Sequence, residues 1–148
     1  MDRDVADVFF EQTSKVFGFL VSEYSFAAPE LEIDDKINFV FVTFTAKNIA
    51  IEFSYDEREG DVTCIIARVI DGKKATYRDA VDEYDTNGVR VREYLSRFLA
   101  RRGVRRRLFT PVAGLDLRER IKVTLSDFAR MLKDHGQVIL EDSPTALI

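Results

Sequence analysis

The residues with the most evident capacity for chemistry form an arginine-rich segment, RRGVRRR, over residues 101–107. Guanidinium groups bind phosphates and carboxylates through paired hydrogen bonds, so this segment can contact nucleic acid or an acidic protein surface. We take Arg101, Arg105 and Arg106 as its candidate contacts. The plainer interpretation is a helix end, where cations complement the helix dipole. A pI of about 5.1 and the lack of an aromatic platform nearby weigh against nucleic acid.

A second charged segment, PELEIDD, precedes the first long apolar run. Its candidate contacts for a basic partner are Glu30, Glu32, Asp34 and Asp35. The chain is acidic early and basic late, because residues 1–60 carry 13 acidic and 5 basic side chains and residues 101–148 carry 6 acidic and 10 basic ones. The two regions either neutralise each other across the fold or form separate faces that steer partners of opposite charge.

Two further acidic clusters have the residue types of a metal site but not the spacing. The segment DEREGD at residues 56–61 departs from the EF-hand pattern, because Arg58 replaces the second ligand and Gly60 falls one place early. We interpret it as a solvated hairpin tip. Asp79, Asp82 and Glu83 share one face at helical spacing with no histidine beside them, which indicates a solvated face. No metal and no cofactor is predicted.

Histidine and cysteine, two residue types that often act in acid–base or nucleophilic catalysis, occur once each in the chain. His135 falls at the end of a helical pattern, where an imidazolium complements the dipole. Cys64 lies within an apolar run without a basic neighbour that would activate it, so we expect an inert thiol. The common nucleotide-binding, zinc-protease and hydrolase motifs are absent. We therefore predict no catalytic residues, with an enzyme built from scattered carboxylates as an alternative.

Three apolar runs separated by turn residues predict an antiparallel meander, around which the chain is organised. These runs cover residues 37–46, 49–55 and 62–70. The middle run alternates, with Ile51 and Phe53 on one face and Ala50, Glu52 and Ser54 on the other. The first run is apolar on both faces, which is typical of a central strand or of one that lines a partner surface. Gly72 then predicts a turn and a fourth short strand at residues 73–76, or a helix instead.

Apolar residues at helical spacing predict helices before and after this meander. Four helices are expected. They run from Asp2 or Asp4 to about Tyr24, from a capping box at Thr76 through Tyr84, from about Val89 to Arg102, and from Asp116 to His135. The apolar stripe of the first helix is wide, so this helix should lie flat on one sheet face. Residues 143–148 are expected to be loose.

Length and composition favour one intracellular domain over residues 1–148. The apolar content of 46% and charged content of 32% are globular values. The chain has no apolar run long enough to span a membrane and no signal-like N-terminus. A single cysteine is consistent with a reducing cytoplasm.

The Phe-rich helix ending in EYSF, the acidic PELEI segment and the hairpin FVTFTAKNIAIEFSYDEREGDV together resemble a class of small bacterial proteins, some of them similar to immunity proteins of polymorphic toxin systems. The resemblance covers residues 8–70 and the last helix. One departure is Ser25, where that class often carries glycine. The resemblance implies a non-enzymatic cytoplasmic binding protein and carries over no functional residues.

These observations predict an α+β fold with an N-terminal helix, a three- or four-stranded antiparallel meander, and two or three C-terminal helices packed on one sheet face. We expect a non-catalytic module that binds another protein, for which a toxin is one candidate. Nucleic-acid binding through the arginines at residues 101–107 is the alternative.

Overall fold

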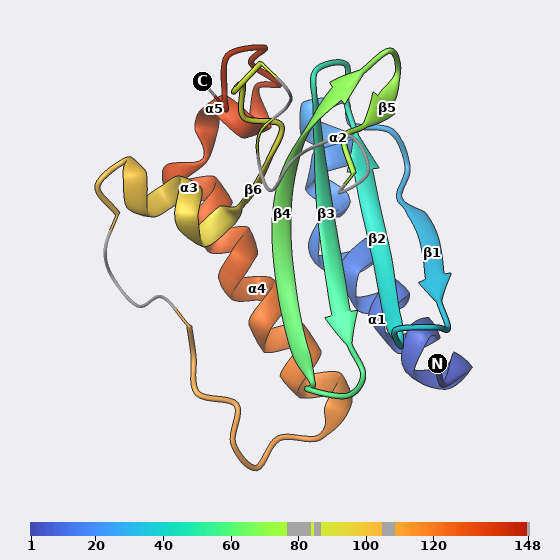
Figure 1. The fold of residues 1–148 in the computed structure, drawn as a ribbon. Coiled ribbons are helices and arrows are strands. Elements are labelled where there is room, and N and C mark those ends of the chain that lie inside the picture. The colour runs from blue at the N-terminus through green and yellow to red at the C-terminus, as the bar shows by residue number, and fades with distance from the viewer. Residues whose placement is uncertain (77–83, 85–86, 105–108, 148) are drawn as a thin grey trace.

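The computed structural model describes residues 1–76, 84, 87–104 and 109–147. These residues form a helical layer on one face of an antiparallel sheet (Figure 1). The helices are α1 Arg3–Val16, α2 Gly18–Tyr24, α3 Leu95–Arg101, α4 Leu117–His135 and α5 Gln137–Leu140. The strands are β1 Glu30–Asp34, β2 Phe39–Thr45, β3 Ile49–Asp56, β4 Asp61–Ile70, β5 Lys73–Lys74 and β6 Arg92–Tyr94. The predicted α+β fold is confirmed, with its C-terminal helices on one sheet face.

Strands β1 to β4 follow one another in the sheet as they do in the sequence, each antiparallel to the next. The three expected runs are β2, β3 and β4, and the short fourth strand is β5. The outer side of β4 pairs with β5 near one end and with β6 along its middle. The sheet therefore extends beyond the expected meander, with β1 added at one edge and β6 at the other.

The expected helix from Val89 to Arg102 is wrong in its first part. Arg92 and Tyr94 lie in β6 opposite residues of β4, and the amide of Arg68 donates to the carbonyl of Val91 at 2.8 Å. The helix α3 begins only at Leu95. Pairing with an existing strand edge overrides the local helical pattern here, because it satisfies backbone groups that β4 would otherwise leave open. The expected short helix through Tyr84 lies almost wholly outside the described residues.

The N-terminal helix is interrupted where the sequence predicts one continuous helix to Tyr24. Asp2 caps α1, accepting from the amide of Asp4 at 2.8 Å. Phe17 leaves the helical conformation, with φ of −104° and ψ of 15°, and α2 starts at the next residue. This break lets the Phe17 ring stack on Phe53 of the sheet at 4.0 Å between centroids. Ser25 then ends α2 with φ of 62°, in the left-handed region that favours glycine.

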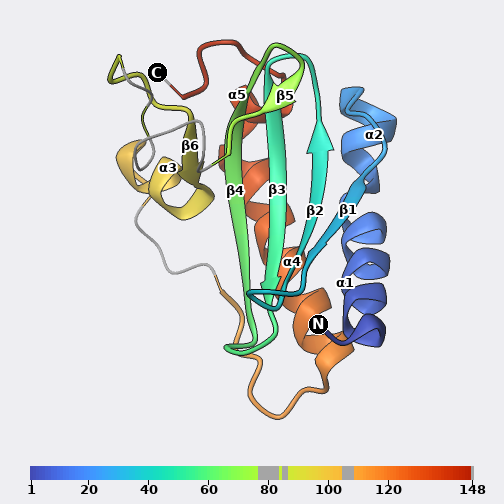
Figure 2. The ribbon, with the colours of Figure 1, turned by 45° about the vertical axis from the view of Figure 1, so that its right-hand side comes forward.

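The core lies between the sheet and the helices α1 and α4, which lie on the same sheet face (Figure 2). Its largest fully buried side chains come from both layers and include Phe9, Phe17, Leu20, Phe44, Phe53, Phe98 and Leu125. Asp116 caps α4 as predicted, accepting from the amide of Glu119 at 2.9 Å. No helix in the described part of the chain is long and apolar enough to cross a membrane.

The C-terminal segment is packed against the fold, contrary to the expectation that it is loose. Ala146 and Leu147 are 1% and 2% exposed. The Asp142 carboxylate accepts hydrogen bonds from the amides of Asn48 and Ile49, each at 2.8 Å, in the turn between β2 and β3. These hydrogen bonds attach the chain at Asp142 to the turn between β2 and β3, and Ala146 and Leu147 beyond it are buried against the fold.

Candidate partner-binding face

One face of the sheet is not covered by any helix of the described chain, and three candidate carboxylates lie on it. The register pairs Glu30 with Thr43, Glu32 with Phe41 and Asp34 with Phe39. Residues directly opposite in a sheet share a face, and neighbours along a strand alternate between faces. Val40 and Val42 therefore point to the helical layer, where they are fully buried. We call Glu30, Glu32 and Asp34 the carboxylate row.

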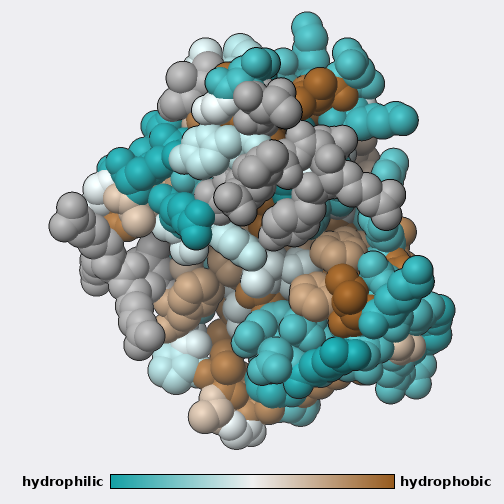
Figure 3. All heavy atoms as spheres, viewed as in Figure 1, coloured by the Kyte–Doolittle hydropathy of each residue, from teal (hydrophilic) through white to brown (hydrophobic). Residues whose placement is uncertain are grey.

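The row lies beside a pair of stacked aromatic rings. The Phe39 and Phe41 ring centroids are 5.7 Å apart and their planes differ by 17°. Both side chains are half-buried, although they lie on a strand whose other face is core. Ser54 and Asp56 of β3 continue the same face beyond them. Figure 3 shows brown and tan atoms over the lower part of β2, bordered by teal hydrophilic atoms. We call the carboxylate row with Phe39, Phe41 and Asp56 the docking face.

A lysine of the chain shows how a cation lies on this face. The Nζ atom of Lys74 is 5.9 Å from the centroid of the Phe41 ring. It donates to Thr43 Oγ1 at 3.0 Å and to Glu52 Oε2 at 2.7 Å. An aromatic face attracts a cation through its quadrupole, and neighbouring carboxylates add to the attraction. Phe39, at the start of β2, offers a similar combination of a ring and carboxylates, because Asp34 of β1 and Asp56 of β3 lie directly opposite it.

Glu52 is the centre of a buried ion cluster on this side of the sheet. Its side chain is 3% exposed and lies between Lys74 and Arg92, whose Nη2 donates to Oε1 at 3.2 Å. Arg92 also donates to the carbonyl of Ala75 at 2.6 Å. Burial raises the pKa of Glu52, but the charges of Arg92 and Lys74 outweigh it and leave that pKa below its ordinary value. The cluster ties Lys74, the carbonyl of Ala75 and Arg92 of β6 to β3, which is a structural role.

The predicted acids differ in the ion pairs and hydrogen bonds that they already form within the chain. Within the part of the chain that the structure describes, Glu30 and Glu32 are exposed and make no ion pair. Asp34 accepts one hydrogen bond, from the amide of Lys36 at 3.0 Å. Asp35, the fourth predicted acid, is instead paired with the N-terminal amine and Arg3. A hydrogen bond from that amine lowers the Asp35 pKa. Three of the four predicted acids are thus brought together.

The arginine-rich segment is partly engaged within the fold. Arg101 Nε donates to both oxygens of Glu93, at 3.0 and 3.1 Å, and Glu93 is a buried residue of β6. The guanidinium groups of Arg101 and Arg102 lie 5.1 and 4.6 Å from the centroid of the Phe98 ring. Arg105 and Arg106 lie outside the described residues. The observed contacts fit the plainer interpretation of this segment, a helix end whose cations pair within the fold.

Apart from Asp56, which belongs to the docking face, the remaining candidates lie away from that face or outside the described chain. The DEREGD segment is the tip between β3 and β4, where Asp56 Oδ1 accepts from the amide of Arg58 at 2.9 Å. Cys64 is buried, and burial raises its pKa well above the ordinary value. His135 ends α4. Asp79, Asp82 and Glu83 are not among the described residues, and among those that are, no three metal-ligating side chains are grouped.

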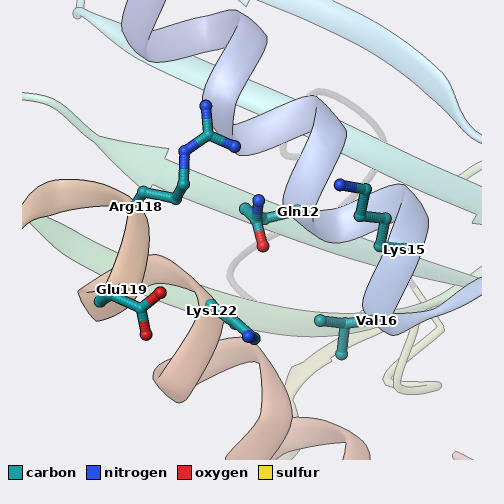
Figure 4. A pocket seen from close by; sticks show the side chains of 6 residues that line it. All are labelled: Gln12, Lys15, Val16, Arg118, Glu119 and Lys122. Carbon is teal, nitrogen blue, oxygen red and sulfur yellow. The ribbon is translucent and has the colours of Figure 1, made fainter.

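On the opposite side of the molecule, α1 and α4 border an open hollow of about 320 Å³. Figure 4 shows Gln12 near its middle, with Arg118 and Glu119 of α4 on one side. Its other lining residues are Lys15, Val16 and Lys122. Glu11 bonds both Arg118 and Lys15, and the hydrogen bond from Arg118 is the main reason that its pKa is lowered. Of the described residues that line the hollow, Glu119 alone is a carboxylate, so these residues do not supply the paired acids that the carboxylate-enzyme alternative requires.

Sequence reasoning found the acids of the docking face but not its arrangement. The signal that could have found it is the first apolar run, whose two apolar faces include Phe39 and Phe41. Recognising Glu30–Asp34 as a strand would have placed the carboxylates beside those rings. Comparisons with models of protein families, with curated proteins and with solved structures find no match to this chain.

Proposed function

We propose that the protein is a non-catalytic binding module whose docking face binds a basic surface of another protein. The observation that carries the proposal is the combination of exposed carboxylates at Glu30 and Glu32 with the stacked pair of Phe39 and Phe41. Aromatic side chains supply contact area at low entropic cost, and a row of like charges steers an oppositely charged partner. Lys74 on Phe41 is an internal example of the contact that a partner's lysine would make.

We favour the docking face over the arginine-rich segment as the binding surface, because fewer of its charged side chains already form ion pairs within the chain. Arg101 is already paired with buried Glu93, whereas Glu30 and Glu32 form no ion pair with another described residue. A partner approaching Arg101 would have to replace an existing ion pair. A partner approaching the carboxylate row would only replace water, although it would still order exposed side chains.

Within this proposal, neutralisation of a toxin is the specific case that the sequence resemblance implies. Toxins that act on nucleic acid carry basic surfaces, which an acidic face complements. The single, buried cysteine suits a protein of the reducing cytoplasm. Co-expression with candidate basic toxins, scored by cell survival, tests this narrower case separately from the binding function itself.

The experiment that tests the proposed function compares capture of proteins from lysate of the source cells by paired variants. Glu30→Lys/Glu32→Lys reverses the row, and Glu23→Lys/Asp134→Lys makes the same change of net charge on exposed helical positions. We expect a basic protein that is retained by the unmodified chain and the helical variant, is lost with the row variant, and elutes as salt is raised. Equal retention by both variants, or no salt-sensitive partner at all, would contradict the proposal.

A further inference from the structure

We propose that the partner contributes an extended segment that adds to the sheet as a new strand beside β1, with lysine or arginine at alternate positions. The inference rests on the proposed function and specifies how the basic partner binds. It differs from contact between two preformed surfaces, because backbone hydrogen bonds supply part of the affinity and fix the register.

The first support is the open edge of β1, which forms the right-hand border of the sheet in Figure 1. In the described chain β1 pairs with β2 alone. An antiparallel strand with one neighbour has alternate amide and carbonyl groups directed away from that neighbour. Glu30, Leu31 and Glu32 are exposed, and Leu31 is 40% exposed. The edge is thus accessible over the strand's first half.

The second support is the alternation of side chains along β1. The carboxylate row lies on the docking face, and Leu31 and Ile33 lie on the other face opposite Val42 and Val40. A strand added beside β1 would place every second residue against the carboxylates. The residues between would meet Leu31 and Ile33. The complementary segment therefore alternates cationic and apolar residues, since opposite charges directly across a sheet attract and apolar pairs bury surface.

The same charges disfavour a second copy of this chain as the occupant. Antiparallel pairing of two β1 strands centred on Glu32 would put Glu32 beside its counterpart and Glu30 beside Asp34 of the other copy. Like charges directly opposite one another are destabilising. Acidic edges of this kind prevent edge-to-edge association in natural sheets. The occupant is accordingly a basic segment of a different protein.

The test uses the full chain and a synthetic blocked peptide, Lys-Val-Lys-Thr-Lys-Val-Lys, titrated by NMR. We expect slowed hydrogen exchange at outward-facing amides of residues 30–34, and binding at least tenfold weaker, in round numbers, for Glu30→Lys/Glu32→Lys. Glu23→Lys/Asp134→Lys is the matched control and should bind as the unmodified chain does. Two further peptides carry N-methyl groups on alternate backbone amides. The first is methylated at the odd-numbered positions and the second at the even-numbered ones, so that each blocks one edge of the extended peptide. At least one should bind at least about tenfold more weakly, because its side chains and charge are kept while edge hydrogen bonds are lost.

The outcomes separate this inference from the proposed function. If both N-methylated peptides bind like the parent peptide while Glu30→Lys/Glu32→Lys still weakens binding, charge recognition stands and strand addition is overturned. If the parent peptide does not bind, strand addition is overturned as well. The proposed function fails only if the capture comparison fails, and that comparison does not use the peptide.

Discussion

Asp142 shows how a single carboxylate joins distant parts of this chain. Its Oδ1 accepts from the amides of Asn48 and Ile49, and its Oδ2 accepts from the amide of Lys47 at 3.1 Å. Its own backbone has φ of 55°, a conformation that asparagine also tolerates. One residue therefore caps the turn between β2 and β3 and fixes the path of the chain after α5.

We predict that Asp142→Asn destabilises the fold by about 1 kcal/mol and Asp142→Ala by about 2–3 kcal/mol. Asparagine keeps one acceptor and suits the left-handed backbone, whereas alanine leaves several amides unsatisfied and is strained there. The measurement is chemical denaturation. Glu141→Gln is the control, because Glu141 is exposed and bonds only Gln137 in the described chain. An alanine variant as stable as the asparagine variant would argue against this role.

A second prediction concerns the buried charge of Glu52. At neutral pH, Glu52→Gln should cost about 3 kcal/mol, because Arg92 and Lys74 lose the anion between them. The folded pKa of Glu52 is lowered, so its contribution is present above the unfolded value near 4.5 and is lost as pH falls through the folded value. The stability difference between the two proteins should therefore shrink at about pH 3.

Urea denaturation at the two pH values checks this prediction, with Glu59→Gln as the exposed control. A stability difference that is constant with pH would show that Glu52 acts through packing and not through its charge.

The sequence predicts residue roles well where the partner is close along the chain. The spacing predicts Asp2 or Asp4 as the first cap and Asp116 as the cap of the last long helix; Asp2 and Asp116 are the caps observed. Glu52 and Asp142 could not be assigned in this way, because their partners are brought to them by the fold. Asp142 is 94 positions from Asn48, and Glu52 is 40 positions from Arg92.

At the scale of elements, β1 is the strand on which the binding account depends. Its residues ELEID have little strand propensity, so the sequence indicates an acidic segment and not a strand. Pairing with β2 makes this segment a strand, and the strand geometry places Glu30, Glu32 and Asp34 together on one face. The helix expected over β6 is wrong for a related reason, since strand pairing is a tertiary property that a local pattern does not contain.

We predict that neutralising the row with Glu30→Gln/Glu32→Gln/Asp34→Asn makes the chain self-associate. The repulsion between paired β1 edges is removed, while Leu31 and the open backbone groups remain. Sedimentation across a range of protein concentrations should show dimers of this variant. The matched control, Glu23→Gln/Glu59→Gln/Asp134→Asn, removes the same charge elsewhere and should stay monomeric. Identical behaviour of the two variants would contradict the role of the row.

At the scale of the molecule, the two sheet faces differ. One is packed against helices, and the other carries no described helix, although Glu52, Ser54 and Ala67 are buried on it. The helices α1 and α4 cover the first face, and Phe17 at the break after α1 fills the space above Phe53. The wide apolar stripe of the first helix predicted this layer correctly. The break at Phe17 was not predicted, because Gly18 alone does not show where the helix must bend to meet the sheet.

We predict that Phe17→Ala costs about 3–5 kcal/mol, because the ring is fully buried and its loss leaves a cavity. Phe109→Ala is the control. Its ring is 50% exposed and contacts Phe128 at an edge, so its loss should cost far less. Thermal unfolding of the two variants measures the difference. Equal costs would show that the Phe17 contact is not central to the core.

The central claim is that the helix-free face with its acidic edge receives a basic protein. Hydrogen exchange of the full chain, with and without the captured partner, tests it most directly. We expect slowed exchange to concentrate in β1 and β2, residues 30–34 and 39–45. Slowed exchange confined to α3, or to the α1 and α4 residues around the hollow, with β1 unchanged, would contradict it.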